Sequence, residues 1–195
     1  MSDAHRIGLL GGSFNPAHSG HVHISELALD LLDLDEVWWL VSPRNPLKEA
    51  DDLKPLDDRI ARARETAAHE SRIRVSDFER ELQTVYTVDT VQALRQRFPA
   101  TRFVWIMGAD NLAQLHRWRG WESLFDQVPV AVFDRPTYSF RALEGAAARK
   151  FATARIGRGE AANLATLTPP AWVFLWTAFD TASSTAIRAE SDETA

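Results

Sequence analysis

Cysteine is absent from the 195-residue sequence. Without thiols the chain can form neither a disulfide bond nor a thiolate metal site, and their absence fits a reducing compartment. Long apolar stretches are missing too, because the longest runs, residues 37–41 and 171–176, are far shorter than the about 20 residues of a membrane-spanning helix. Residues 1–10 lack the apolar core of a signal peptide. We therefore expect a cytoplasmic protein with no membrane partner.

Positive charge is also scarce. The chain has 22 lysines and arginines against 27 aspartates and glutamates, which gives a net charge of −5 with histidine neutral. Proteins that bind nucleic acids usually present a basic face studded with aromatic residues. The charge therefore argues against a nucleic-acid partner, although it permits a local positive pocket for one nucleotide. Nothing in the sequence indicates the oligomeric state.

Two common nucleotide-binding motifs are missing. The sequence contains no Gly-x-x-x-x-Gly-Lys-Ser/Thr, which argues against a P-loop kinase. The glycine fingerprint of dehydrogenases does not follow the first apolar run, and the second run ends at Ser42 and Pro43 without an acidic residue for a ribose. Residues 157–162 match that fingerprint only loosely and follow no predicted strand.

Short β-rich runs alternate with longer stretches of helical periodicity. This alternation predicts an α/β fold: a single doubly wound Rossmann-like domain with a mainly parallel sheet. We expect the domain to span residues 1–190 and residues 191–195 to form a polar C-terminal tail. The expected strands are residues 6–11, 36–42, 72–77, 102–107, 130–134 and 172–177; the expected helices are residues 20–32, 57–70 and 87–98, with another starting near Ser184.

Some residues have expected structural roles. Trp38 and Trp39 belong to the core of the second strand. Ser19 is suited to cap the first helix, and Asp57 or Asp58 the second. The charged run at residues 79–81 is typical of a solvated face with local ion pairs.

The first loop, residues 11–21, reads Gly-Gly-Ser-Phe-Asn-Pro-Ala-His-Ser-Gly-His. Gly11 and Gly12 allow the backbone to approach a ligand closely. His18 and His21 are three residues apart at a helix start, so they project from the same face. The helix start adds unpaired N–H groups and a positive partial charge. The loop therefore suits a group that gains negative charge, such as a phosphoryl centre under attack.

Two other interpretations of the histidines remain open. Each imidazole can be a structural or solvated side chain. A zinc site is a further alternative, since two histidines three apart can share a metal, but no third ligand lies close in the sequence. The combination of strand, paired glycine, phenylalanine, proline and His-x-Gly-His is harder to produce by accident.

The first loop resembles the His-x-Gly-His signature of the nucleotidylyltransferase superfamily. Near the other end of the chain, the run that begins at Ser183, Ser184 and Thr185 and ends at Arg188 resembles the Ser-Ser-Thr-x-x-Arg motif of the same superfamily. The two motifs stand in the expected order, about a domain apart. Taken alone, the second motif is more typical of an ordinary N-capped terminal helix; paired with the first motif, it favours the superfamily.

The middle of the chain resembles one branch, the bacterial nicotinate-mononucleotide adenylyltransferases. Residues 43–48 resemble the acceptor loop of that family, and similar residues also occur at 86–87, 108–110, 118 and 135–136. The resemblance extends to about Arg188. The chain departs from the family pattern at Ser13, Asn15 and Leu47, where Thr, Asp and His are common; Asn15 and Leu47 concern acceptor binding more than the reaction.

The resemblance implies that ATP and nicotinate mononucleotide react, with Mg²⁺ accompanying ATP, to give nicotinate adenine dinucleotide and pyrophosphate. It assigns catalytic roles to His18, His21 and Arg188 and no protein ligand to a metal. The implied ATP-binding residues are Gly11, Gly12, Ser13, Phe14, His18, His21, Gly108, Asp110, Ser183, Ser184, Thr185 and Arg188. The implied acceptor-binding residues are Ser13, Phe14, Asn45, Lys48, Tyr86, Thr87, Trp118 and Arg135.

Alternatives stay open for several of these. Lys48 is equally typical of a solvated loop, and Asp110 can meet a ribose, organise Mg²⁺ or cap the next helix. Trp118 can stack on a pyridine ring or pack in the core, as we expect of Trp121. For the whole chain, the alternatives are a sister transferase acting on phosphopantetheine or another phosphorylated acceptor, and a nucleotide-binding regulator without catalysis.

Overall fold

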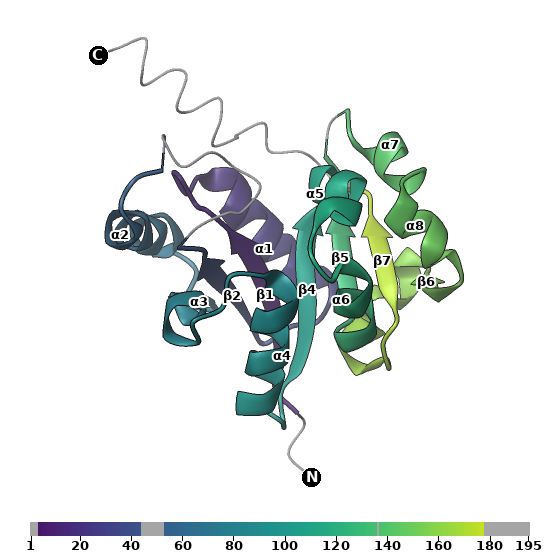
Figure 1. The fold of residues 1–195 in the computed structure, drawn as a ribbon, viewed down its shortest axis with the longest axis horizontal. Coiled ribbons are helices and arrows are strands. Elements are labelled where there is room, and N and C mark those ends of the chain that lie inside the picture. The colour runs from purple at the N-terminus through teal and green to yellow at the C-terminus, as the bar shows by residue number, and fades with distance from the viewer. Residues whose placement is uncertain (1–3, 44–52, 136, 178–195) are drawn as a thin grey trace.

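The computed structural model describes residues 4–43, 53–135 and 137–177. In that part of the chain a seven-stranded sheet has the order β3-β2-β1-β4-β5-β7-β6, and every neighbouring pair is parallel (Figure 1). The strands are β1 (Arg6–Gly12), β2 (Glu36–Val41), β3 (Ile73–Ser76), β4 (Arg102–Gly108), β5 (Val130–Phe133), β6 (Arg155–Ile156) and β7 (Trp172–Leu175).

Helices cover both faces of the sheet. One hydrophobic core lies under α1 (Ser19–Leu31), α2 (Leu56–Ala67) and η3 (Arg158–Thr166). The other lies under α3 (Phe78–Glu81), α4 (Thr87–Arg97), α5 (Ala109–Gln114), α6 (Trp121–Gln127), α7 (Ser139–Leu143) and α8 (Ala146–Lys150). Two short 3-10 helices, η1 (Leu115–Arg117) and η2 (Ala152–Ala154), complete the described elements. None of the described helices is long and apolar enough to cross a membrane.

The two tryptophans of β2 show why this strand is apolar throughout. Side chains alternate across a strand, and a parallel strand covered by helices on both sides buries both faces. Trp39 is fully buried in the first core, and Trp38 is buried in the second. Their expected place in the core is confirmed.

The site edge of the sheet follows from the strand order. β1 lies between β2 and β4, so the chain leaves the centre of the sheet in both directions. In a doubly wound sheet, ligands bind beyond the carboxyl ends of the strands at this reversal. The loops after β1, β2, β4 and β5 all reach that edge, which is uppermost in Figure 1.

The predicted fold class is confirmed, and the expected strands and helices are found with shifted ends. Residues 155–156 add β6, which the sequence did not predict. α2 starts one residue before Asp57, so Asp57 and Asp58 lie in its first turn and Pro55 occupies the cap position. The helix expected near Ser184 and the tail at residues 191–195 lie outside the described residues, so the domain division stays a prediction.

Gly11 owes its identity to packing. A Cβ built on Gly11 would lie 2.5 Å from Cη2 of Trp105, a buried indole of β4. At neighbouring Gly12 the nearest atom to such a Cβ is Cε2 of Phe14 at 3.5 Å, an ordinary contact. The sequence interpretation of close ligand approach therefore does not explain Gly11, whose missing side chain leaves room for the indole.

We predict that Gly11→Ala lowers the free energy of unfolding by about 1–3 kcal/mol, because the methyl group overpacks the core against Trp105. Gly12→Ala is the matched control and should change stability far less. Urea unfolding of both variants at constant protein concentration measures the difference. Equal stability of the two variants would contradict the packing argument.

Candidate active site at the carboxyl edge of the sheet

Both histidines of the first loop accept hydrogen bonds from backbone N–H groups at the start of α1. The N–H of Gly20 donates to Nδ1 of His18 over 3.1 Å, and the N–H of His18 donates to Nδ1 of His21 over 3.3 Å. His18 is therefore the N-cap of α1, and the expectation that Ser19 fills this position is wrong, because an imidazole nitrogen accepts the capping bond. With both Nδ1 atoms accepting, each neutral ring holds its proton on Nε2. The pair thus offers two N–H donors.

A column of rings supports His21 from the core. The His21 ring lies 4.7 Å from that of Phe14, and Phe14 stacks on Trp39 at 5.0 Å between centroids. The indole N–H of Trp39 donates to the Ser25 hydroxyl, which in turn donates to the His21 carbonyl. Phe14 is buried, so its ring acts as a support; its predicted contact with ATP or the acceptor stays a prediction.

Burial keeps His21 uncharged. It lowers the pKa of His21 from 6.5 to about 3, and the nearby His18 imidazole and Arg135 guanidinium act in the same direction. Below about pH 6.5 the unfolded chain therefore binds a proton at His21, whereas the folded state binds one there only when the pH falls to about 3. His21 is therefore a neutral hydrogen-bond donor at physiological pH, rather than an acid that gives up its proton.

Asp110 and Arg135 come from two other strand ends. Asp110 lies in the first turn of α5, after Gly108, and its Oδ2 accepts a 2.8 Å hydrogen bond from Nη1 of Arg135. Gly108 holds the cap position of α5, so Asp110 does not cap the helix. The other carboxylate oxygen, Oδ1, is buried and has no hydrogen-bond partner among the described residues. An oxygen in that state suits a hydroxyl donor such as that of a ribose.

The start of α4 lies beside the turn that follows η1. The Arg119 guanidinium lies 4.5 Å above the Tyr86 ring, and a Cβ on Gly120 would meet Val88 at 2.9 Å. Thr87 is the first residue of α4, and no side chain in the described part of the chain caps this helix start. The structure therefore brings Tyr86, Thr87 and the turn containing Trp118 together.

Both tryptophans of this region contact the core. Trp118 is partly buried and packs against the second core. Trp121 packs there too, with its ring edge-on to Phe151 at 6.1 Å, so its expected packing role is confirmed. The proposed stacking of Trp118 on a pyridine ring stays a prediction.

Most of the predicted site residues lie in the part of the chain that the structure describes. One loop contains Gly11, Gly12, Ser13, Phe14, His18 and His21. Near it lie Gly108, Asp110 and Arg135, as shown by the Arg135–Asp110 ion pair and by the effect of Arg135 on the pKa of His21. Six predicted residues lie outside the described ranges: Asn45, Lys48, Ser183, Ser184, Thr185 and Arg188.

Sequence reasoning missed Arg59, a buried arginine of α2. Its guanidinium donates hydrogen bonds to carbonyl oxygens of the loops after β1 and β2. Arg59 stands at four-residue spacing with the buried Ala63 and Ala67. An arginine on the apolar face of a helix is a signal that points to a buried polar network.

Glu79 corrects the expectation of a solvated face at residues 79–81. Its neighbours do form surface ion pairs, Arg80 with Asp57 and Glu81 with Arg97. Glu79 itself is buried, and burial raises its pKa to about 7, while a hydrogen bond from Ser42 acts in the opposite direction. Its Oε2 has no hydrogen-bond partner in the described part of the chain.

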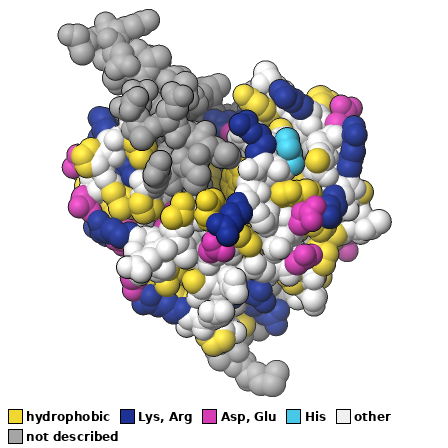
Figure 2. Space-filling model, viewed as in Figure 1, with side chains coloured by type: hydrophobic (Ala, Val, Ile, Leu, Met, Phe, Trp, Pro, Cys, Tyr) yellow, Lys and Arg dark blue, Asp and Glu magenta, His cyan; other side chains and the backbone are white. Residues whose placement is uncertain are grey.

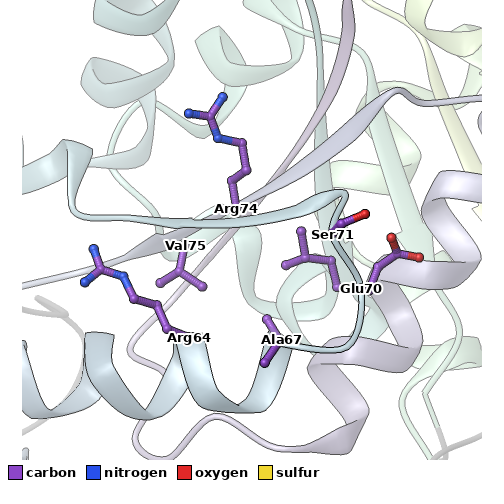
Figure 3. Close-up of a pocket in the computed structure, with 8 residues that line it drawn as sticks. Arg64, Ala67, Glu70, Ser71, Arg74 and Val75 are labelled. Carbon is purple, nitrogen blue, oxygen red and sulfur yellow. The ribbon is translucent and has the colours of Figure 1, made fainter.

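Other features of the described surface lie apart from the predicted site. A hollow of about 310 Å³ lies between α2 and β3, where Arg64 and Arg74 border it, and none of the predicted site residues lines it (Figure 3). Basic side chains on the face seen in Figure 2 are interspersed with acidic and apolar ones. Within the described ranges, no group of three or more His, Asp or Glu side chains is arranged to hold a metal ion.

Comparison with known proteins gives one consistent family. The model of the cytidylyltransferase-like family matches residues 9–190. A protein of Caulobacter sp. (strain K31), named probable nicotinate-nucleotide adenylyltransferase, is 52% identical over 183 residues, which are 94% of this chain and 96% of that protein. A protein of the same name from Bradyrhizobium sp. (strain ORS 278) is 53% identical over 183 residues, 94% of this chain and 95% of its own.

Solved structures agree in fold. Plasmodium falciparum nicotinic acid mononucleotide adenylyltransferase, complexed with NaAD, has a TM-score of 0.69 and covers 95% of this chain and 83% of that chain. Its sequence identity is 16%, so this likeness shows the fold alone.

We predict that Glu79→Gln stabilises the protein in a pH-dependent way. Because the folded pKa of about 7 lies above the ordinary 4.5, the folded state loses stability as pH rises through this window and bears the full cost of the charge above it. Glutamine bears no charge. We expect the Tm of Glu79→Gln, minus that of the wild type, to be about 4–8 °C larger at pH 8 than at pH 5. This corresponds to a loss of wild-type stability of the order of 2 kcal/mol over the same range.

Thermal unfolding at both pH values checks this prediction, with Glu81→Gln as the matched control. Glu81 belongs to the same helix but is exposed and paired with Arg97. Its replacement should give no gain at the higher pH. If the Tm difference between Glu79→Gln and the wild type is the same at pH 5 and pH 8, the assignment of a buried titrating carboxyl is wrong.

Proposed function

The chain belongs to the cytidylyltransferase-like family and acts as a nicotinate-nucleotide adenylyltransferase in NAD biosynthesis, and we propose that the acceptor phosphate attacks the α-phosphate of ATP directly and in line. A bond forms between an acceptor phosphate oxygen and the α-phosphorus, and the bond from that phosphorus to the β-phosphate oxygen breaks. The products are nicotinate adenine dinucleotide and pyrophosphate. The observation that carries the mechanism is the pair of imidazoles at the start of α1, His18 and His21, each oriented by a backbone N–H that donates to its Nδ1.

The chemistry needs positioning more than proton transfer. The acceptor phosphate is already an anionic nucleophile, so no general base has to activate it. Charge builds on the phosphate oxygens during transfer, and preorganised donors stabilise it. We assign this task to the Nε2–H groups of His18 and His21 and to the amides at the start of α1, since the rings are fixed before substrate arrives.

The other strand ends complete the ATP half of the site. Gly11, Gly12 and Ser13 present backbone near the triphosphate, and the unpartnered Oδ1 of Asp110 accepts a bond from a ribose hydroxyl. Arg135 orients Asp110 through its other oxygen and adds positive charge. By the resemblance of the second motif, Ser183, Ser184, Thr185 and Arg188 bind the phosphates of ATP.

The acceptor half lies at the start of α4. Its uncapped amides, at Thr87 and beside it, suit the nicotinate carboxylate, because a helix start attracts an anion. Tyr86 and Trp118 frame the pyridine ring, and Arg135 faces the acceptor phosphate. Asn45 and Lys48 complete acceptor binding by resemblance.

We further propose that Mg²⁺ enters with ATP. The described side chains provide no cluster that would hold the ion alone, so the triphosphate oxygens are the ligands that fit it best. When bound, the ion neutralises part of the triphosphate charge. Every other step depends on the residues named above.

We predict that the protein releases pyrophosphate from ATP and Mg²⁺ in the presence of nicotinate mononucleotide. His18→Ala and His21→Ala should each lower kcat by about 10²–10³-fold, the typical cost of losing one such donor. A coupled pyrophosphate assay at saturating substrates measures the loss. Nicotinamide mononucleotide and phosphopantetheine are offered in parallel.

His23→Ala is the matched control, since His23 belongs to α1 but lines a hollow with Glu26 and His69 that neither His18 nor His21 lines. It should leave kcat close to that of the wild type. Release only with phosphopantetheine would overturn the acceptor while leaving the mechanism in place. A folded protein that binds ATP and releases no pyrophosphate with any acceptor would be a regulator.

A further inference from the structure

Arg59 is a buried cation whose hydrogen-bond partners among the described residues are main-chain carbonyls. Nε donates to Lys54 over 2.8 Å, Nη1 donates to Ser13 over 2.5 Å and to Ser42 over 2.8 Å, and Nη2 donates to Pro43 over 3.2 Å. The residue is 2% exposed. A guanidinium can satisfy this many acceptors because its donors radiate in one plane.

The four carbonyls belong to three separate stretches of chain. Ser13 lies in the loop after β1, beside the histidine pair. Ser42 and Pro43 follow β2, and Lys54 precedes α2. Pro43 and Lys54 flank the segment that contains the predicted acceptor residues Asn45 and Lys48. Arg59 therefore joins the triphosphate side of the site to the base of the acceptor side.

Two further hydrogen bonds reinforce the same junction. The N–H of Lys54 donates to Oδ1 of Asn15 over 3.4 Å, which again links the first loop to the start of α2. The hydroxyl of Ser42 bonds to the buried carboxyl of Glu79, on the opposite layer of helices. Ser42 is thus held by its carbonyl from one side and by its hydroxyl from the other.

A buried guanidinium with no carboxylate partner among the described residues carries an energetic cost. None of the ion pairs between described residues includes Arg59. Burial disfavours the charged form and lowers the pKa of Arg59, although an arginine stays protonated. α2 also buries the apolar residues Ile60 and Ala63, so apolar contacts help attach the helix to the sheet. What Arg59 adds is a set of hydrogen bonds to the carbonyls of the loops after β1 and β2.

We propose that Arg59 is a positioning residue for adenylyl transfer, because it fixes the Ser13 carbonyl of the first loop relative to the Ser42 and Pro43 carbonyls at the start of the acceptor loop. This inference rests on the proposed function. In-line transfer requires the acceptor phosphate and the α-phosphate to be held within a fraction of an ångström of their productive positions. A misplacement of about 1 Å costs about 10²-fold in rate. Arg59 sets this distance without touching either substrate.

The test compares Arg59→Lys and Arg59→Met with Arg62→Met. Lysine keeps the charge but has one nitrogen in place of the fork, methionine keeps the apolar stem, and Arg62 is an exposed residue of the same helix. We expect both Arg59 variants to lose about 10²-fold in kcat at saturating substrates. The Kd of a non-hydrolysable ATP analogue and that of nicotinate mononucleotide, each measured alone, should stay within about threefold of the wild type. Arg62→Met should match the wild type in all three measurements.

The split between kcat and Kd separates positioning from stability. All assays are run well below the Tm of each variant, and if Arg59→Met does not fold, Arg59→Lys supplies the result. A kcat within about threefold of the wild type in a folded Arg59 variant would overturn the proposal, as would a rise in either Kd that accounts for the whole loss. If the wild type uses a different acceptor, the same comparison is made with that acceptor, so the fate of Arg59 is decided separately from that of the proposed substrate.

Discussion

The parallel alignment of β1 between β2 and β4 is the constraint on which the site depends. Parallel strands end at the same edge, so the loops after β1, β2, β4 and β5 meet there even though they are far apart in sequence. The helices that follow these strands begin at this edge, so their N-termini lie beside the site. Histidine donors, an acidic acceptor and an arginine therefore converge without any long-range sequence signal. The hydrophobic burial of β1 and β2 on both faces is what makes this convergence rigid.

Rigidity matters because the site works with neutral donors. A charged imidazole would attract a triphosphate from farther away, yet it would be costly to bury next to Arg135. The molecule instead fixes both rings by backbone hydrogen bonds and supports one of them on Phe14 and Trp39. Phe14 adopts a left-handed backbone conformation, with φ of 46°, which is uncommon for a bulky side chain. Packing of its ring in the core offsets that local strain.

The buried strand β2 and the loop before α1 could be predicted because their sequence signals are local. The continuous apolar run that contains Trp38 and Trp39 predicts a strand buried on both faces, and the glycine pair followed by His-x-Gly-His predicts a phosphate-binding loop at a helix start. The fates of Arg59 and Glu79 were not predictable in this way. Their burial depends on partners such as Ser13 and Ser42, which lie far away in sequence. Charge therefore suggested a solvated face for Glu79, and Arg59 was not singled out at all. β6 was missed for a similar reason, since two residues carry no periodic pattern and pair only because β7 lies beside them.

The hydrogen bonds of Arg59 have a consequence for how such a protein can change over generations. Every acceptor is a main-chain oxygen, and main-chain oxygens are the same whatever side chain stands above them. Substitutions at these positions that preserve the backbone path leave the junction intact. Pro43 and Lys54 are held in the same way, through oxygens that every residue type carries. The junction thus tolerates changes of side chain at the residues it joins, whereas a change at Arg59 itself removes all four bonds together.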